Sequence, residues 1–595
     1  MKSRLTHPGR NSALSGMAVA IVLAAVALRG PAAAPASAAP ATACPGGDTG
    51  ITLSPGFCAT VFADNLGHVR HLAVTADGTV YANSWSGRYY HNDTPPSGGF
   101  LVALKDSGGT GHADTVKRFG EGVPDGAAGG TGIAFYNHAI YAEVNDRIVR
   151  YARRPGEIVP SGKPETILSG MPLVGDHPMH PFVIDAKGNL YVDSGSATNS
   201  CQSENRMPDS AGIQPCTELE TRGGIWRYDA NKTGQTFSPA ERFATGIRNG
   251  EGFAFDAAGH LFATQHGRDQ LSQNWPKLYT VEQGVDLPAE EIVQLRKGGD
   301  HGWPECYYDQ NQKKLVLAPE YGGDGGKTVG ICAEKLAPIA AFPGHWAPND
   351  LLIYNGTQFP KPYRDGAFVA FHGSWNRAPL TQSGYNVVFQ PMAEGTASGP
   401  YIVFADGFAG AHKDPGRAAF RPTGLAMGPD GALYIADDVH GRIWRVTYRG
   451  GGTTAQLEAA PQPAVAAASP NSPLPPEGIH PDAGRQTAAL PLPPGATREQ
   501  VALGNRIFHG EASDGTCSGC HGSDAGGTSV GPPLNGGIWV QTDGSLPSIA
   551  HIIATGVTNP RDYTGVMPPK GGAPLSDDDV AAVAAYVWAI GHTAN

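Results

Sequence analysis

Between residues 50 and 448, apolar and polar residues alternate in short stretches that come in pairs. A period of two buries one face of a strand and exposes the other, so each pair predicts a β-hairpin. The two stretches are joined by a tight turn that usually contains Gly, which is typical of short hairpin turns. The clearest hairpins are LAVTADGTVYAN from residue 72, IAFYNHAIYAEV from 133, FVIDAKGNLYVDSG from 182, FAFDAAGHLFATQ from 253 and LAMGPDGALYIADD from 425, with a weaker copy in LLIYNG from 351 and GAFVAFHG from 366.

A hairpin repeated six times, with loops of variable length between copies, is the signature of a radial β-architecture. A β-sandwich with coincidental hairpins is the alternative. The recurring turn pattern D-G-x-[LV]-[YF] is more regular than strand alternation in a sandwich requires. The sequence therefore predicts a mainly β fold, a six-bladed β-propeller over residues 44–448.

The pattern changes after the propeller. Residues 449–495 are rich in Pro, Ala, Gly and Ser, a composition that cannot bury a core and is typical of an extended linker. Residues 496–595 have helical periodicity and predict a small all-α domain. Its expected helices lie in TREQVALGNRIFHG, SLPSIAHIIATGV and LSDDDVAAVAAYVWAIGH, the last with Ser576 as N-cap and three aspartates in its first turn.

The N-terminus has the pattern of an export signal. Lys2, Arg4 and Arg10 precede an apolar stretch over residues 13–28, and small residues follow up to residue 43. Residues 1–38 are therefore predicted to be a signal peptide cleaved after Ala38 or Ala43, and the mature protein is expected to be periplasmic or secreted. A membrane anchor is the alternative, but the stretch is short for a span. Lipidation at Cys44 is a further alternative, although the preceding residues lack the bulky aliphatic side chain expected there.

Composition agrees with a β-rich fold. The chain of 595 residues contains 81 Gly and 50 Pro, and only 16% of its residues are charged, which favours many turns over long solvated helices. The net charge is −11, and no basic run follows the extreme N-terminus, so a nucleic-acid-binding surface is not expected.

The cysteines divide into two groups. Two of the eight lie in the stretch CSGCH, at Cys517 and Cys520. The other six form an even set that suits disulfides in an oxidising compartment. Among the 15 possible connectivities, we expect pairing between sequence neighbours, namely Cys44 with Cys58, Cys201 with Cys216 and Cys306 with Cys332.

The pattern C-x-x-C-H is that of c-type haem attachment. Cys517 and Cys520 would form the thioether bonds to haem, and His521 would be the proximal iron ligand. A zinc half-site would need two further ligands, and no other cysteine lies in this domain. A redox-active C-x-x-C would need a βαβ context, which the pattern does not predict.

Met567 is the expected sixth ligand of the iron. It is the only methionine of the helical domain, and it lies in the Gly- and Pro-rich loop TGVMPPK. Ligation by Met and His raises the potential of a haem, which suits an electron acceptor. His509, His551 and His592 are weaker alternatives. The domain resembles class I cytochrome c, including GPPLNG from residue 531, where that family places a proline loop beside the proximal histidine.

Several propeller loops are rich in polar and cationic residues, and loops at one end of successive blades line one central pocket. No G-x-G-x-x-G follows a strand to open a helix, so neither a nicotinamide nor a Rossmann-type flavin is predicted. The loops are GDHPMH from 175, TGIRNGEG from 245, TQHGRD from 264, KGGDHGWPE from 297, HGSWNR from 372 and FRPTG from 420.

The order of GDHPMH, GIRNGEG, KGGDHGWPE and GPDGALYIADD resembles the soluble sugar dehydrogenases that depend on pyrroloquinoline quinone (PQQ), a family that includes glucose, sorbosone and pyranose dehydrogenases. The resemblance implies that His177 is the general base for the substrate hydroxyl, held by Asp176. An imidazole suits this role because its pKa lies near the working pH.

The resemblance also implies a set of cofactor ligands. Arg248 and Asn249 would lie near the quinone oxygens, with Arg248 also in a catalytic role, and Arg377 and Arg421 would bind PQQ carboxylates. The backbone carbonyls of Gly267 and Arg268 would bind a Ca²⁺ ion that bridges PQQ. One departure is Thr423, which stands where glucose dehydrogenases have a second arginine and which makes glucose a doubtful substrate.

These inferences predict an exported quinohaemoprotein dehydrogenase with PQQ, Ca²⁺ and haem c. It would oxidise a sugar, or a related alcohol or aldehyde, and pass electrons to its own haem and then to an external acceptor. Two alternatives stay open: a Ca²⁺-dependent hydrolytic propeller of the lactonase kind, and a non-catalytic binding propeller beside an electron-transfer cytochrome.

Overall fold

The computed structural model describes two segments at length, the propeller and the helical domain. The described residues are 44, 49–84, 96–120, 130–374, 376–377, 380–411, 413, 418–450, 490–510, 512–513, 515, 517–522, 525–527, 531–563 and 565–593. The predicted signal peptide, residues 1–38, and most of the predicted linker, residues 449–495, lie outside them.

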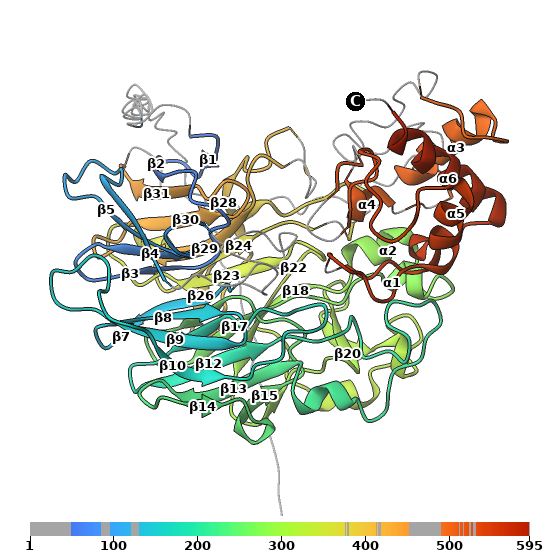
Figure 1. Ribbon diagram of the computed structural model, residues 1–595. Coiled ribbons are helices and arrows are strands. Elements are labelled where there is room, and N and C mark those ends of the chain that lie inside the picture. Colours follow the sequence, from blue (N-terminus) through green and yellow to red (C-terminus); the bar gives the residue numbers. More distant parts are fainter. Residues whose placement is uncertain are drawn as a thin grey trace, which may run out of the picture. The chain divides into compact units, whose positions relative to one another are not determined.

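The first half of the propeller forms three sheets, each built on four antiparallel strands (Figure 1). Blade 1 contains β3 (Leu72–Val74), β4 (Val80–Asn83), β5 (Leu101–Lys105) and β6 (Thr115–Phe119). Blade 2 contains β7 (Ile133–Tyr136), β8 (Ala139–Val144), β9 (Arg147–Ala152) and β10 (Glu165–Ser169), with β14 (Gln235–Thr236) added in parallel. Blade 3 contains β11 (Phe182–Ile184), β12 (Asn189–Ser194), β13 (Gly224–Asp229) and β15 (Arg242–Thr245), with β19 (Gly299–Asp300) added in parallel.

Three more sheets complete the ring. Blade 4 contains β16 (Phe253–Phe255), β17 (Leu261–Gln265), β18 (Glu290–Leu295) and β22 (Ala340–Phe342). Blade 5 contains β23 (Pro348–Ile353), β24 (Ala367–Phe371), β25 (Asn386–Gln390) and β28 (Ile402–Asp406), extended by β1 (Thr52–Leu53). Blade 6 contains β29 (Pro422–Met427), β30 (Leu433–Asp437), β31 (Ile443–Tyr448) and β2 (Phe57–Ala63).

Short elements decorate the loops of the propeller. They are the hairpins β20 (Cys306–Asp309) with β21 (Lys314–Leu317) and β26 (Met392–Ala393) with β27 (Thr396–Ala397), the helices α1 (Leu271–Asn274) and α2 (Val281–Asp286), and 3-10 turns at Thr217–Glu220, Pro239–Glu241, Pro319–Tyr321, Gly330–Glu334 and Lys361–Tyr363.

The predicted six-bladed propeller is confirmed. Each of the six hairpins found in the sequence forms the first two strands of one blade. In the first blade, for example, Leu72 lies opposite Ala82 and Val74 opposite Val80. The alternation of the strands is therefore sufficient to locate every blade.

The ring is closed by a strand from the start of the chain. β2 pairs with β31, so that Phe57 lies opposite Tyr448 and Cys58 opposite Thr447 (Figure 1). The Phe57 side chain is 6% exposed and packs edge-on against the rings of Phe359 and Phe404, with centroid distances of 4.8 Å in both cases. Blades 5 and 6 thus share an aromatic core to which the closing strand contributes.

All three predicted disulfides are confirmed: Cys44–Cys58, Cys201–Cys216 and Cys306–Cys332. The first bond engages the Cys44 sulfur, which removes the alternative of a lipid attached there. Cys517 and Cys520 form no disulfide.

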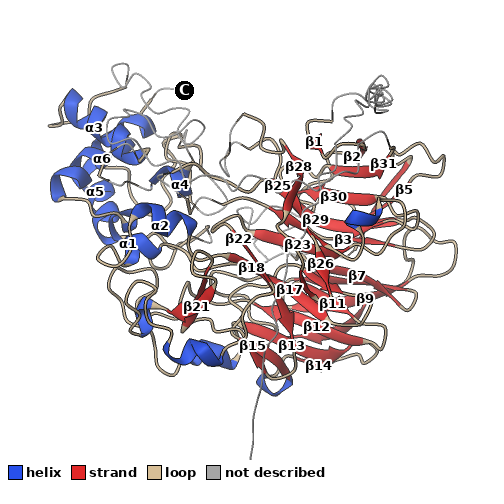
Figure 2. Cartoon of the chain, turned by 180° about the vertical axis from the view of Figure 1, so that it is seen from behind, coloured by secondary structure: helices blue, strands red, loops and turns tan. Residues whose placement is uncertain are grey.

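The domain after the linker consists of helices, as predicted (Figure 2). They are α3 (Arg498–Phe508), α4 (Cys517–His521), α5 (Leu546–Thr555) and α6 (Asp577–Gly591), with a 3-10 turn at Pro569–Gly572. The Ser576 side chain accepts a hydrogen bond from the Asp579 backbone N–H, and Asp579 bonds back to Ser576 in a capping box. α3 packs closely on α6 at Gly504, where a Cβ would lie 2.0 Å from the Ala582 carbonyl oxygen.

No helix among the described residues is long and apolar enough to cross a membrane.

Truncation of the closing strand's aromatic anchor, Phe57→Ala, should lower the free energy of unfolding by about 3–5 kcal/mol, because it removes a buried ring and leaves a cavity. Calorimetry of the purified protein would measure the shift of the propeller transition. The control is Val116→Ala in β6, where the side chain is 50% exposed and the expected change is within about 0.5 kcal/mol. Equal shifts for both variants would contradict the role assigned to closure.

Candidate functional site

One cavity of the propeller is lined by loops that precede the first strand or follow the second strand of several blades. His177 lies before β11, Arg248 and Asn249 lie before β16, and Asp269 follows β17. Strand ends converge in a propeller, so residues far apart in the sequence meet here. The lining also includes Arg70, Asp176, Arg206, Glu251, His266, Gly267, Glu290, His345, Asn349, His372 and Asn376.

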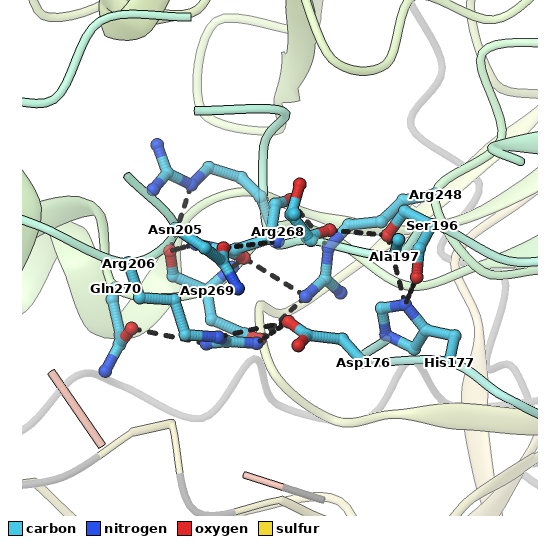
Figure 3. Close-up of polar contacts among 12 residues, drawn as sticks. Asp176, His177, Ser196, Ala197, Asn205, Arg206, Arg248, Arg268, Asp269 and Gln270 are labelled. Atoms are coloured by element: carbon cyan, nitrogen blue, oxygen red, sulfur yellow. Dashed lines mark hydrogen bonds and ion pairs between the residues drawn. The ribbon is translucent and has the colours of Figure 1, made fainter. Parts of the chain in front are cut away.

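His177 contacts Ser196 instead of the expected Asp176. Its Nδ1 atom lies 3.0 Å from the backbone oxygen of Ser196 and 3.0 Å from the Ser196 hydroxyl (Figure 3). The Asp176 carboxylate instead accepts hydrogen bonds from Arg206, at 2.8 Å from Nη2 and 3.1 Å from Nε. The expectation that Asp176 holds His177 is therefore wrong, because a nearby guanidinium engages this carboxylate.

Two arginines share one buried carboxylate in this pocket. Asp269 Oδ2 lies 2.8 Å from Arg248 Nη2 and 3.1 Å from Arg206 Nη2 (Figure 3). Burial alone would raise the pKa of Asp269, but the charges of Arg248 and Arg206 lower it well below its ordinary value. The carboxylate is thus ionised and joins the two guanidinium groups into one network.

The environment of His177 disfavours its charged form. Burial lowers the pKa of His177 well below its ordinary value, and the positive charge of Arg248 lowers it further. At neutral pH the imidazole is uncharged and able to accept a proton. This is the state that a general base requires.

The other predicted PQQ and Ca²⁺ ligands fall into two groups. Arg248, Asn249 and Gly267 line the pocket, and Arg248 Nη1 donates to the Gly267 carbonyl oxygen at 2.9 Å. Arg377 and Arg421 are not among the lining residues.

These two arginines hold loops together by binding backbone carbonyl groups. Arg377 donates to the oxygens of Val285 and Gly344, and Arg421 donates to those of His372 and Gly373. The structure therefore gives both side chains partners other than a ligand in the pocket.

Arg268 and Thr423 also have partners elsewhere. The Arg268 side chain pairs with Glu320 at 2.6 Å, so only its backbone carbonyl is a candidate for binding a cation. The Thr423 hydroxyl donates to the Val69 carbonyl oxygen at 2.9 Å.

Arg206 was not identified from the sequence. It lies in the loop closed by the Cys201–Cys216 disulfide and belongs to no recognisable motif. Only the cysteines that flank this loop signalled that it is structurally constrained. Arg70, His266, His345 and His372 line the same pocket, and of these only His266 and His372 lie within the polar loops singled out from the sequence.

The predicted haem ligands line one cavity in the helical domain: Cys517, Cys520, His521 and Met567. His521 Nδ1 lies 2.9 Å from the Pro532 carbonyl oxygen, which can only accept a hydrogen bond, so Nδ1 carries the hydrogen. The other ring nitrogen, Nε2, is left as a ligand for a metal. Apolar residues complete the wall, among them Phe508, Leu534, Ile549, Ile553, Val583 and Val587.

The alternative sixth ligands do not line this cavity. His509 is buried and bonds to the Asn505 carbonyl oxygen, His551 is exposed, and His592 stacks on Trp588 with a ring distance of 3.9 Å. Within the part of the chain that the structure describes, no three His, Cys, Asp or Glu side chains form a cluster able to hold a metal ion.

Comparison with known proteins divides the chain in the same way. Residues 51–449 match the family model described as TrAA12-like, and residues 500–587 match the one described as cytochrome c oxidase, cbb3-type, subunit III.

An uncharacterised protein of Borreliella burgdorferi is 28% identical over 275 residues, covering 45% of this chain and 64% of that protein. The PQQ-dependent pyranose dehydrogenase of Coprinopsis cinerea is 27% identical over 240 residues, covering 33% of this chain and 30% of that protein. The matched part is thus under two thirds of the length of either relative.

Solved structures share the propeller fold. The calcium structure of the family AA12 carbohydrate-active enzyme from Trichoderma reesei aligns with a TM-score of 0.53 and 18% identity, covering 67% of this chain and 97% of that one. The PQQ domain of pyranose dehydrogenase from Coprinopsis cinerea aligns with a TM-score of 0.52 and 19% identity, with the same coverage.

Removal of the shared carboxylate, Asp269→Asn, should lower the free energy of unfolding by about 3–5 kcal/mol, because a buried guanidinium loses its counter-ion. Calorimetry would detect the loss in the propeller transition. The double variant Asp269→Asn/Arg248→Met removes the unpaired cation as well and should be more stable than Asp269→Asn alone. A double variant that is less stable than the single one would contradict this account of the network.

Proposed function

The chain belongs to the TrAA12-like family, and on this premise we propose that its propeller is a PQQ-dependent dehydrogenase that oxidises a sugar or a related alcohol or aldehyde. The observation that carries the proposal is that His177 shares one pocket with the guanidinium groups of Arg206 and Arg248, where burial and the charge of Arg248 lower the pKa of the imidazole. A base and fixed cations in one pocket suit proton removal beside a bound anion.

The residues of the pocket fit PQQ, which has three carboxylates and a pair of carbonyl oxygens. Arg70, Arg206 and Arg248 supply positive charge at the pocket wall. The Asn249 Oδ1 atom is buried without a hydrogen-bond partner among the described residues, which leaves a polar group for a ligand. When bound, PQQ would supply the acceptor for the C–H hydrogen of the substrate together with its two electrons, and the protein would supply position and charge.

In this proposal His177 removes the hydroxyl proton of the substrate. Its Nδ1 atom is engaged by Ser196, so Nε2 is the atom that accepts the proton. Arg248 opposes the positive charge that then forms on the ring. The proton is therefore held weakly and can be released once the electrons have left.

A Ca²⁺ ion is part of the proposal because the pocket alone is not positive enough for a polyanion. Its three arginines face the four carboxylates of Asp176, Glu251, Asp269 and Glu290. A divalent cation would offset the added negative charge of PQQ. The backbone carbonyls of Gly267 and Arg268 remain the proposed ligands, since carbonyl oxygen is a preferred donor to Ca²⁺. The Gly267 oxygen would then exchange its hydrogen bond from Arg248 for the cation.

We further propose that the helical domain is a haem c site, in which Cys517 and Cys520 would attach the haem and His521 and Met567 would bind its iron. When bound, haem would take up electrons one at a time and pass them to an external acceptor such as a soluble cytochrome. The three disulfides support an oxidising location, so the proposed site of action is the periplasm or the outside of the cell.

The full-length protein, supplied with PQQ and Ca²⁺, should show haem reduction with at least one member of a panel of aldoses, ketoses and alcohols. His177→Ala should lower this rate by a factor of about 10²–10⁴, because general-base catalysis is lost, while PQQ binding persists. Stopped-flow absorbance of the haem measures the rate. The control is His260→Ala, which changes an exposed histidine of the β16–β17 turn.

Each of the other outcomes would indicate a different function for the propeller. Hydrolysis of lactones without PQQ would identify a hydrolytic propeller. A haem spectrum that no substrate changes would identify a binding propeller, and full turnover of His177→Ala would exclude this histidine as the base.

Met567→Ala should leave the haem covalently attached but lower its midpoint potential, because a thioether ligand stabilises the reduced iron. Spectroelectrochemistry of the full-length protein would measure the change. His551→Ala is the matched control at an exposed position and should leave the potential unchanged. The assignment of Met567 would be wrong if its replacement had no effect on the potential.

A further inference from the structure

We infer that Ser196 is a positioning residue that fixes the tautomer of His177, with the hydrogen on Nδ1 and the lone pair on Nε2. The inference deepens the proposed function, on which it rests, by naming the group that prepares the base. Ser196 belongs to none of the polar loop motifs or hairpin repeats of the propeller sequence.

The geometry at Nδ1 admits one tautomer. The backbone oxygen of Ser196 lies 3.0 Å from Nδ1, and a carbonyl oxygen can only accept a hydrogen bond. Nδ1 must therefore carry the hydrogen. In a neutral imidazole the second nitrogen, Nε2, then has no hydrogen and is the proton acceptor.

The Ser196 hydroxyl adds a second acceptor. Its oxygen also lies 3.0 Å from His177 Nδ1, and the hydroxyl donates its single hydrogen to the Thr198 carbonyl oxygen at 2.6 Å. With that hydrogen engaged, the hydroxyl oxygen faces Nδ1 with a lone pair. The tautomer with its hydrogen on Nε2 would point the lone pair of Nδ1 at two oxygen atoms. This repulsion is unfavourable because the contact is buried.

Backbone contacts fix the distance between Ser196 and His177. Ser196 is fully buried, and its backbone N–H donates a hydrogen bond to the Arg248 carbonyl oxygen at 2.7 Å. The Asp176 N–H donates to the Ala197 carbonyl oxygen at 2.9 Å. The Asp176–Ala197 bond therefore joins the two chain segments beside the contact between serine and histidine, and the Ser196–Arg248 bond ties the serine to a third segment.

The Arg222 side chain also bridges the segments that contain His177 and Ser196. Its Nη1 atom donates to the carbonyl oxygens of His177 at 3.0 Å and Gly195 at 3.2 Å. Gly195 allows the close approach, since a Cβ there would lie 2.7 Å from His177 Cβ. Ser196 thus meets His177 within a rigid frame and not through a mobile side chain.

The charged groups around His177 keep its imidazole in the unprotonated form, and the uncharged Ser196 at Nδ1 does not oppose this effect. Arg248 and His266 oppose protonation of the ring and Asp269 favours it, whereas Asp176 is paired with Arg206. No carboxylate bonds to Nδ1 among the described residues, since Ser196 occupies that position. The free base is the form that reacts, so activity should be constant above the pKa of His177 and fall below it.

The test compares Ser196→Asp with Ser196→Asn, two side chains of equal size that differ in charge. A carboxylate beside Nδ1 should raise the pKa of His177, so the acid limb of kcat/KM for Ser196→Asp should move up by about 1–3 pH units. Ser196→Asn should leave the limb where the wild-type protein has it. Identical acid limbs for the two variants would overturn the inference.

A second measurement needs neither catalysis nor a variant that tolerates a buried charge. Full-length protein labelled with ¹⁵N-histidine should give an Nδ1 resonance with a directly bonded hydrogen and an Nε2 resonance without one, assigned by their loss in His177→Gln. The reverse pattern would overturn the inference even if a sugar reduces the haem. If no substrate reduces the haem, the proposed function fails, while this spectrum still decides the tautomer.

Discussion

The pairing of β2 with β31 is the constraint on which the propeller site depends. It joins residues from the two ends of the repeat region, Phe57 and Tyr448, and thereby fixes the last blade against the first. A closed ring leaves each blade packed on both sides and no open gap between blades 6 and 1. Loops that begin or end at the inner strands are then held at fixed distances, which is what a pocket assembled from several blades requires.

The pocket holds more buried charge than stability alone would favour. Removing charges from water costs several kcal/mol per ion, and the pairs formed between Arg206, Arg248 and Asp269 offset that cost only with good geometry. The rigid ring supplies that geometry. A fixed network also needs no rearrangement when a charged ligand arrives, so its electrostatic effect is available from the start.

Local patterns predicted the local structure. Hairpin alternation, helix caps and disulfides between sequence neighbours depend on residues close in the sequence, and the corresponding elements are present. Side-chain partners in the pocket could not be predicted in this way. Asp176 binds Arg206, which lies 30 positions away in a loop without a motif, and Arg377 and Arg421 bind carbonyl groups of distant loops.

The two cavities differ in a way that suits opposite tasks. The propeller pocket is charged and can orient an anion beside a base, whereas the cavity around His521 and Met567 has mostly apolar walls. An apolar surrounding disfavours the more highly charged oxidised iron, and a Met and His ligand pair acts in the same direction. Under the proposed function, both effects raise the haem potential and favour electron flow out of a reduced quinone. Under this proposal, the apolar lining would add to the effect of the two ligands in making the helical domain the electron acceptor.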